Sequence, residues 1–308
     1  MYEISIEPTS HCQLSCDMCP HGDMSRIKGF MDWNLYCKII DDIRAIGPIR
    51  KLHMQVLGES FLHPRMVDMI NYAEGVAHEL HVNTNGLPFK DPALRKAIIE
   101  SSLSSLTFSI NAFTRETYEK MQGRDKFEEC VDAFSKLIVD QQLATPGGHG
   151  PNVGPQLLAK MVLCDTNRHE WELFKAYWER FGAYKAVYKE TMDWHGSKEE
   201  YSRNFHDKIR WRCHYLWNNM TILWDGNVVP CCIDWDGEVS FGNAKDAHLL
   251  DIFTGTTACL FRNDHKWKMY AELCKNCDYW RWDTRFKKID TGINDQNDTE
   301  FRSTPDEL

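Results

Sequence analysis

The chain has 308 residues, of which 43% are hydrophobic and 26% are charged. This composition is typical of a globular protein with one large domain and room for a second, smaller one. The net charge of −9 argues against a nucleic-acid-binding protein, and it suits a neutral or cationic small-molecule substrate, although solubility explains it equally well. No apolar run approaches the ~20 residues of a membrane-spanning helix, and Met1–Glu7 lacks signal-peptide features. We therefore expect a cytoplasmic protein without a membrane partner.

Strand and helix patterns alternate along the first 190 residues. Strands are expected at 2–7, 51–57, 81–83, 105–110, 156–163 and 186–188. Helices are expected at 32–46, 64–77, 91–101, 114–122, 127–140 and 168–181. Glycine or polar residues follow several of the strands, so we expect a parallel α/β sheet or barrel whose functional loops collect at the carboxyl edge.

The alternation ends near residue 205. Residues 220–229 predict a hairpin with Asp225-Gly226 as its turn, and a short helix is expected at 248–254. Residues 145–151 form a Gly/Pro-rich loop, and the polar, acidic segment 291–308 is expected to be a mobile tail. The predicted domains are 1–205, 206–290 and this tail.

Three cysteines follow the first predicted strand: Cys12, Cys16 and Cys19. The chain has twelve cysteines and no secretion signal, which favours metal or cluster ligation over disulfides. A structural zinc site would need a fourth ligand, for which His21 is available. Three thiols at the end of a strand suit an iron–sulfur cluster better than a zinc site, because such a cluster can leave one of its irons open to another ligand.

This Cys-x3-Cys-x2-Cys motif, with Met18 before its third cysteine, resembles the radical S-adenosylmethionine (SAM) superfamily. Residues 56–60 are similar to the superfamily's glycine-glycine-glutamate element, with Leu57 at the first glycine and Ser60 where proline is common. The resemblance implies a partial (β/α)6 TIM-type barrel and a SAM-binding [4Fe–4S] cluster on the three cysteines. The SAM contacts that it implies are Met18, Gly58, Glu59, Asn85, Ser109 and Asn111, with Glu59 on the SAM amino group.

A second cysteine set comprises Cys213, Cys231 or its neighbour Cys232, Cys274 and Cys277. Four thiols with one Cys-x2-Cys pair would suit a zinc ribbon. Beside a SAM-cluster domain, the set resembles the twitch or SPASM type of auxiliary domain, which implies a small α+β domain holding a second [4Fe–4S] cluster. Additional cysteines of the full SPASM pattern are missing, so one auxiliary cluster is expected.

The resemblance also implies a reaction. SAM cleavage would give a 5′-deoxyadenosyl radical that removes a hydrogen atom from the substrate. Electron transfer to the auxiliary cluster would give dehydrogenation, whereas a hydrogen atom from Cys259 would give epimerisation. The chain is similar in size and cysteine count to 2-deoxy-scyllo-inosamine dehydrogenase and neomycin epimerase, which implies an aminocyclitol, aminoglycoside or sugar substrate and a flavodoxin- or ferredoxin-type electron donor.

Two other functions remain open. The first is modification of a ribosomally made peptide. Because the first strand is expected to begin at Tyr2, we expect no N-terminal peptide-recognition domain, which weakens this function without removing it. The second is a zinc-stabilised binding protein without enzymatic activity. Residues near the domain junction could contact a substrate: Lys189, Glu190, Asp193, His195 and Arg210.

Overall fold

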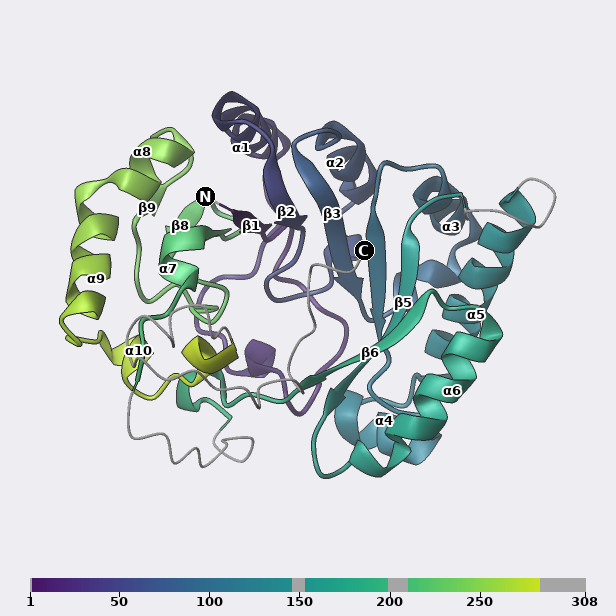
Figure 1. Cartoon of the computed structure of the whole chain (residues 1–308). Helices are drawn as coiled ribbons and strands as arrows, with labels where there is room; N and C mark the ends of the chain where they lie inside the picture. Colours follow the sequence, from purple (N-terminus) through teal and green to yellow (C-terminus); the bar gives the residue numbers. More distant parts are fainter. Residues whose placement is uncertain (1, 146–152, 199–209, 283–308) are drawn as a thin grey trace, which may run out of the picture.

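The computed structural model describes residues 2–145, 153–198 and 210–282 (Figure 1). Its described strands form one sheet in the order β6-β5-β4-β3-β2-β1-β7-β8-β9, and strands β1 to β7 are parallel. The sheet curves as a partial barrel that does not close. The strands are β1 (Glu3–Ile6), β2 (Ile49–His53), β3 (Ala77–Thr84), β4 (Ser105–Ser109), β5 (Gln156–Leu163), β6 (Lys185–Glu190), β7 (Asn219–Ile222), β8 (Asn227–Val229) and β9 (Gly242–Asn243).

Helices cover the outer face of the parallel strands (Figure 1). These helices are α1 (Trp33–Ile46), α2 (Met66–Tyr72), α3 (Pro92–Ile99), α4 (Arg115–Gln122), α5 (Phe127–Ala144) and α6 (Trp171–Phe181). The C-terminal part carries α7 (Tyr215–Asn218), α8 (Leu249–Thr254), α9 (Thr256–Lys266) and α10 (Glu272–Lys275). No described helix is both long and apolar enough to cross a membrane.

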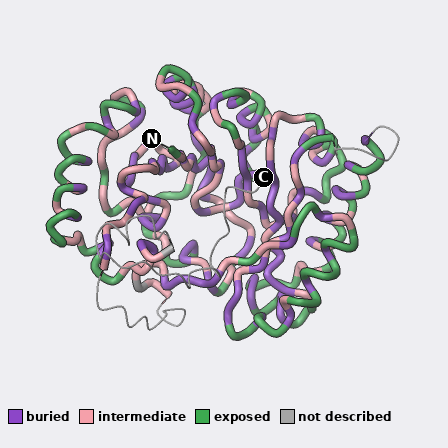
Figure 2. Tube along the Cα trace, viewed as in Figure 1, coloured by how far each residue is buried: buried purple, intermediate pink, exposed green. Residues whose placement is uncertain are grey.

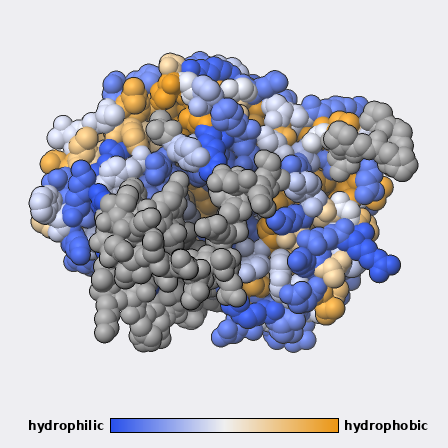
Figure 3. All heavy atoms as spheres, viewed as in Figure 1, coloured by the Kyte–Doolittle hydropathy of each residue, from blue (hydrophilic) through white to orange (hydrophobic). Residues whose placement is uncertain are grey.

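The two faces of the sheet differ in chemistry. Along β5 the side chains alternate between buried and half-buried, and the buried ones pack in the main hydrophobic core with the helices (Figure 2). The other face is polar, with Ser5 on β1, His53 on β2 and Asn83 on β3. Parallel strands covered on both faces are usually apolar throughout, so this alternation indicates an open, polar barrel interior. Where Figure 3 colours the surface, it is mostly hydrophilic, with smaller hydrophobic patches between.

Local signals explain the helix boundaries. The Asp32 carboxylate accepts hydrogen bonds from the backbone N–H groups of Asn34 and Leu35 and so begins α1. The helix ends before Gly47, whose φ of 104° is a conformation that favours glycine. In the same way, Thr114 caps α4 at its start and Gly123 follows its end.

The predicted strand 51–57 was wrong at both ends. β2 begins at Ile49 and ends at His53, because residues beyond Met54 turn back instead of pairing with a neighbouring strand. The Ser60 hydroxyl donates to the Met54 carbonyl (2.6 Å), and the Leu57 N–H donates to the buried Glu7 carboxylate (3.3 Å). The helix predicted at 64–77 is likewise shorter, since Ala77 already begins β3.

The hairpin predicted at 220–229 is confirmed, with Thr221 opposite Val229. Its first strand, β7, also pairs in parallel with β1, where Glu3 lies opposite Asn219. The C-terminal part therefore extends the barrel sheet. The segment around the predicted domain boundary at residue 205, most of the Gly/Pro loop and the predicted tail at 291–308 lie outside the described residues, so the boundaries stay a prediction.

Candidate functional site: one cavity and two cysteine sets

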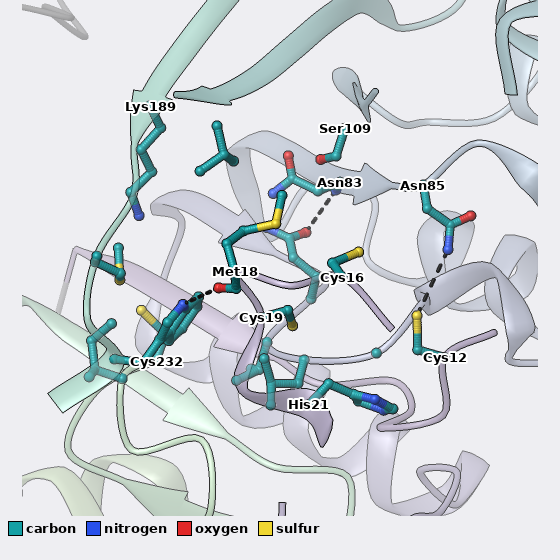
Figure 4. Close-up of a pocket in the computed structure, with 18 of the residues that line it drawn as sticks. Cys12, Cys16, Met18, Cys19, His21, Asn83, Asn85, Ser109, Lys189 and Cys232 are labelled. Carbon is teal, nitrogen blue, oxygen red and sulfur yellow. Dashed lines mark hydrogen bonds between the residues drawn. The ribbon is translucent and has the colours of Figure 1, made fainter. Parts of the chain in front are cut away.

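A cavity of about 630 Å³ lies inside the partial barrel, at the carboxyl ends of its strands. All three N-terminal cysteines and all six predicted SAM contacts line it. Figure 4 shows Cys16, Met18 and Cys19 near its middle, with Cys12 and Asn85 on one side and Lys189 and Cys232 on the other. The tertiary structure thus gathers residues from β1, β3, β4, β5 and β6 around one space.

Backbone hydrogen bonds hold the cysteine loop in place. The N–H of Asp17 donates to the Met121 carbonyl (3.1 Å), and the N–H of Cys19 donates to the Cys16 carbonyl (3.1 Å). The Cys16 thiol donates to the Gln122 side-chain oxygen (2.5 Å). Burial raises the pKa of Cys19 to about 11, and burial with the nearby Cys19 and Cys12 raises the pKa of Cys16 well above its usual range. These thiols therefore need a bound cation or metal to become thiolates near neutral pH.

Gly58 allows the turn after β2 to lie directly against the cysteine loop. Its φ is +82°, and a Cβ added there would lie 2.6 Å from the Thr9 carbonyl oxygen. The next N–H, of Glu59, donates to the His11 carbonyl (2.8 Å). The two departures from the superfamily pattern, Leu57 and Ser60, are accommodated in this turn.

The Glu59 carboxylate is buried at the cavity wall. It accepts hydrogen bonds from the Asn85 N–H (2.6 Å), the Thr84 hydroxyl (2.9 Å) and the Phe61 N–H (3.2 Å). Burial outweighs these bonds and raises the pKa of Glu59 to about 7. A carboxylate oxygen can accept more than one hydrogen bond, so a cationic group in the cavity would find an anchored acceptor here.

The other predicted SAM contacts differ in the hydrogen-bond partners of their polar groups. The Asn85 amide donates to the Cys12 sulfur (3.9 Å), and its oxygen accepts from Gln13 (3.2 Å). The Asn111 side-chain oxygen accepts from the Val162 N–H (2.8 Å), so this residue fixes the start of the turn after β4. Ser109 lines the cavity, and the Met18 carbonyl accepts from the Trp194 indole (2.8 Å).

The C-terminal cysteines lie around a second, smaller cavity. Cys213, Cys231, Cys274 and Cys277 all line it, together with apolar and aromatic side chains. Burial raises the pKa of Cys213 to about 12 and that of Cys274 to about 11. Cys232, by contrast, lines the large cavity, and its thiol lies 3.8 Å from the Tyr279 hydroxyl.

Both cysteine sets fit iron–sulfur clusters. Within the described residues, no three His, Cys, Asp or Glu side chains are grouped so that they could hold a single metal ion. A cluster does not need such a group, since each thiolate binds a different iron. His21, the formal fourth zinc ligand, has its Nε2 2.7 Å from the Ser10 carbonyl oxygen.

Several other predicted residues lie elsewhere. Cys259 is exposed on α9 and does not line the cavity, and its thiol donates to the Thr254 carbonyl (3.2 Å). Asp193 and His195 do not line it, whereas Lys189 and Glu190 do. Arg210 lines the smaller cavity.

Sequence reasoning missed α9 and several residues of the large cavity. The buried positions of α9 include Arg262 and His265, so the helix has no continuous apolar stripe to reveal it. The missed cavity residues include Asn83, Gln122, Lys160 and Tyr279, and Cys232, which the sequence offered only as an alternative cluster ligand, lines this cavity too. The sequence signal that could have identified Asn83 and Lys160 is their position between residues that are buried in the core along β3 and β5, which places both on the opposite face of the sheet.

Comparison with known proteins agrees with this geometry. Residues 6–142 match the family model of the radical SAM superfamily, and residues 213–278 match that of the SPASM iron–sulfur cluster-binding domain. A tungsten-containing aldehyde ferredoxin oxidoreductase cofactor-modifying protein of Pyrococcus furiosus is 24% identical over 318 residues, which cover 90% of this chain and 87% of that protein.

Two solved structures share the fold. The structure of BtrN in complex with AdoMet and 2-DOIA has a TM-score of 0.54 and 18% identity, covering 90% of this chain and 93% of BtrN. The structure of Streptococcus suis SuiB bound to the precursor peptide SuiA has a TM-score of 0.67 and 11% identity, covering 91% of this chain and 72% of SuiB.

The chain is therefore an enzyme of the radical SAM superfamily, with a SPASM-type domain after its barrel. Its cofactors are a [4Fe–4S] cluster with SAM in the radical SAM domain and auxiliary iron–sulfur clusters in the SPASM domain.

Proposed function

We propose that the enzyme removes a hydrogen atom from a small polar molecule bound in the large cavity, and that the product is dehydrogenated or epimerised. The observation that carries this proposal is the single cavity of about 630 Å³ that Cys12, Cys16, Cys19 and Glu59 share with polar residues of the barrel interior. This volume lies within the ~300–1,000 Å³ of ordinary small-molecule sites.

In this proposal Cys12, Cys16 and Cys19 bind the first cluster, and the Glu59 carboxylate accepts a hydrogen bond from the SAM amino group. The bound cluster and SAM supply the radical that abstracts the hydrogen atom. Asn85 donates toward the Cys12 sulfur and so stabilises its thiolate form. Ser109 and Met18 complete the SAM site at the cavity wall.

Cys213, Cys231, Cys274 and Cys277 are the proposed ligands of one auxiliary cluster, because these four thiols share the smaller cavity. A cluster with four protein ligands has no open iron for a substrate, so we assign it the role of electron acceptor. Dehydrogenation then follows when the substrate radical loses an electron and a proton. A flavodoxin or ferredoxin is the proposed electron donor to the first cluster.

Epimerisation is the second candidate reaction, and it requires a thiol that reaches the substrate. Cys232 lines the large cavity, whereas Cys259 is exposed on α9 outside it. We therefore propose Cys232 as the hydrogen-atom donor if the product is an epimer.

The cavity also bears on the substrate class. The Pyrococcus relative is named for modifying a cofactor, which favours a small molecule for this chain too. BtrN and SuiB show that the fold alone does not separate a small molecule from a peptide. An aminocyclitol, aminoglycoside or sugar and a ribosomal peptide are thus the classes to compare, and the cofactor in the name of the Pyrococcus relative favours the former group.

The test uses anaerobically reconstituted protein. About eight irons per chain are expected for two [4Fe–4S] clusters, whereas stoichiometric zinc would refute the proposal. With SAM and dithionite the protein should release 5′-deoxyadenosine, and the Cys12→Ala/Cys16→Ala/Cys19→Ala variant should release none. Cys259→Ala is the matched control and should behave like the wild type.

The reaction type is decided in D2O with a panel of sugars, aminocyclitols and peptides. An epimer should carry one solvent deuterium at the inverted carbon, whereas a dehydrogenated product should carry none. Turnover of peptides alone would refute the small-molecule proposal.

A further inference from the structure

Two basic side chains from distant parts of the chain line the smaller cavity together with its four cysteines. Arg210 precedes α7, and His265 lies near the end of α9. The sequence offered Arg210 only as a substrate contact, and it gave no role to His265. The other residues of the described wall are apolar or aromatic: Leu216, Ile233, Leu273, Tyr279 and Trp280. Arg210 and His265 are therefore the basic groups that face the four thiols.

Both residues have buried nitrogen atoms without a hydrogen-bond partner in the described part of the chain. These atoms are Nε of Arg210 and both ring nitrogens, Nδ1 and Nε2, of His265. The His265 side chain is only 2% exposed, so its ring is shielded from bulk water. A buried donor without an acceptor is costly, and native structures rarely contain one without a reason. The orphaned nitrogens therefore indicate an acceptor inside the cavity.

Aromatic contacts hold the two side chains at the wall. The central carbon of the Arg210 guanidinium lies 3.9 Å from the centre of the Tyr270 ring. The His265 ring meets the same tyrosine edge-on, with 4.9 Å between the ring centres. A terminal nitrogen of Arg210 also donates to the carbonyl of Lys275 (3.1 Å), the residue that follows Cys274. These contacts fix Arg210 and leave its Nε without a partner.

Helix α9 brings His265 to the cavity. Arg262, three residues earlier on the same side of the helix, donates to the carbonyl oxygens of Leu216 in α7 and Phe253 in α8 (2.6 Å each). These two bonds tie α9 to its neighbours. The end of the helix consequently lies beside α10, which carries Cys274 (Figure 1).

The chemistry of the two donors suits a cluster held by thiolates. Burial raises the pKa of Cys213 and that of Cys274, and the nearby positive charge of Arg210 opposes this rise for both. A guanidinium stays protonated in proteins, and an imidazole keeps at least one N–H donor in either protonation state. Thiolate and sulfide sulfur atoms of a cluster accept such hydrogen bonds. The residues present therefore fit the auxiliary cluster.

We propose that Arg210 and His265 donate hydrogen bonds to sulfur atoms of the auxiliary cluster and thereby raise its reduction potential. This inference rests on the proposed cluster at the four C-terminal cysteines and on its role as electron acceptor. Neither residue lines the large cavity, so both are positioning residues that act on the reaction through the cluster.

The physical reason is the charge that reduction adds. The substrate radical gives one electron to the cluster and one proton to water, and the cluster gains one negative charge. A fixed positive charge and N–H donors stabilise the reduced cluster more than the oxidised one, which raises the potential. Arg210 and His265 thus favour transfer of the electron away from the substrate.

The test is a redox titration of the full-length, anaerobically reconstituted protein. Cys12→Ala/Cys16→Ala/Cys19→Ala removes the first cluster, and electron paramagnetic resonance then follows reduction of the auxiliary cluster in loaded molecules. His265→Phe and Arg210→Met, each added singly, should shift the equilibrium toward the oxidised form roughly 10-fold or more, as expected for loss of a hydrogen bond to a charged group. A tenfold shift in this one-electron couple lowers the potential by ~59 mV.

Conservative variants and a matched control sharpen this titration. Arg210→Lys keeps the charge and His265→Gln keeps an N–H donor, so each should lower the potential less than Arg210→Met or His265→Phe does. Lys266→Met is the control, because Lys266 is an exposed residue of α9 next to His265. Solvent screens its charge, so the potential should not change. An unchanged potential in His265→Phe or in Arg210→Met would overturn the proposal for that residue.

A spectroscopic measurement separates a hydrogen bond from a purely structural role. After exchange into D2O, pulsed electron–nuclear double resonance of the reduced cluster should detect a deuteron that is missing in His265→Phe. Identical deuteron signals in the two proteins would overturn the hydrogen bond from His265, even if the potential differs.

Iron analysis keeps this proposal distinct from the proposed function. The triple cysteine variant should hold about four irons per chain in its auxiliary cluster. A loaded cluster whose potential ignores both substitutions would refute the roles of Arg210 and His265 and leave the proposed function intact. A triple variant without iron would refute the auxiliary cluster itself, and with it the proposed electron acceptor.

Discussion

Cys231 and Cys232 are adjacent in the sequence, yet their side chains line different cavities. Cys231 lines the smaller cavity with three other cysteines, and Cys232 lines the large one beside Tyr279. The peptide between them thus joins the proposed auxiliary-cluster site to the proposed substrate site, and Ile233 and Tyr279 line both cavities.

This arrangement predicts different outcomes for two neighbouring serine variants. Cys231→Ser should lower the iron content from about eight to about four per chain, because it removes a cluster ligand. Cys232→Ser should keep about eight irons. Iron and sulfide analysis with electron paramagnetic resonance measures both. Loss of a cluster in Cys232→Ser alone would reverse the assignment.

Gly58→Ala should disrupt the cysteine loop. The new Cβ would lie 2.6 Å from the Thr9 carbonyl oxygen, and the φ of +82° is unfavourable for alanine. We expect a loss of about 2–4 kcal/mol in the free energy of unfolding and poor reconstitution of the first cluster. The measurements are urea unfolding and iron content.

The matched control is Gly75→Ala. Its φ of +78° is nearly the same, but a Cβ there meets nothing within 4 Å. It should therefore report the backbone strain alone, about 1 kcal/mol, with normal iron content. Equal losses in the two variants would show that the close approach at Thr9 is unimportant.

Lys160→Met should stabilise the ligand-free protein in a pH-dependent way. Burial, with the nearby positive charge of Lys189, lowers the native pKa of Lys160 to about 7, below the unfolded value of 10.5, so the unfolded state binds more protons between these pH values. The lysine therefore costs stability fully below pH 7, and the cost disappears as the pH rises toward 10.5. The variant should exceed the wild type by about 1 kcal/mol or more at pH 7, and the gap should shrink at pH 9.5.

Urea unfolding at both pH values, followed by circular dichroism, measures this gap. Lys136→Met serves as the control, since the exposed ion pair of Lys136 with Asp132 should contribute less than about 1 kcal/mol at either pH. A gap of constant size would mean that Lys160 keeps an ordinary pKa.

Arg26→Met should destabilise the junction between the barrel and the C-terminal hairpin. The Arg26 guanidinium donates to the buried Glu7 carboxylate (2.6 Å), which also accepts from the N–H groups of Leu57 (3.3 Å) and Trp224 (3.2 Å). Removing the cation leaves a buried, uncompensated carboxylate, at a cost of about 3–5 kcal/mol. Thermal unfolding measures the loss.

Adding Glu7→Leu to Arg26→Met should recover part of that loss, because the pair is then replaced by apolar groups. A double variant no more stable than Arg26→Met would show that the hydrogen bonds of Glu7 to the backbone matter more than its charge.

Much of the barrel could be predicted from the sequence. Alternating strands and amphipathic helices gave the six parallel strands, and β5 was placed at 156–163 as observed. The hairpin was recognisable from Asp225-Gly226, and the cysteine spacing before Pro20 indicated the first cluster. These features are local, so the residues that define them lie within a few positions of one another.

Only the tertiary structure decided the rest. The structure pairs β7 with β1 and places Lys160 near Lys189, and the residues of each pair are distant in sequence. It also places the side chains of Cys231 and Cys232 in different cavities, although the two residues are of the same type. Periodicity tells which face of an element a side chain occupies. It does not tell which strands become neighbours or which cavity that face encloses, because those depend on packing between elements across the whole chain.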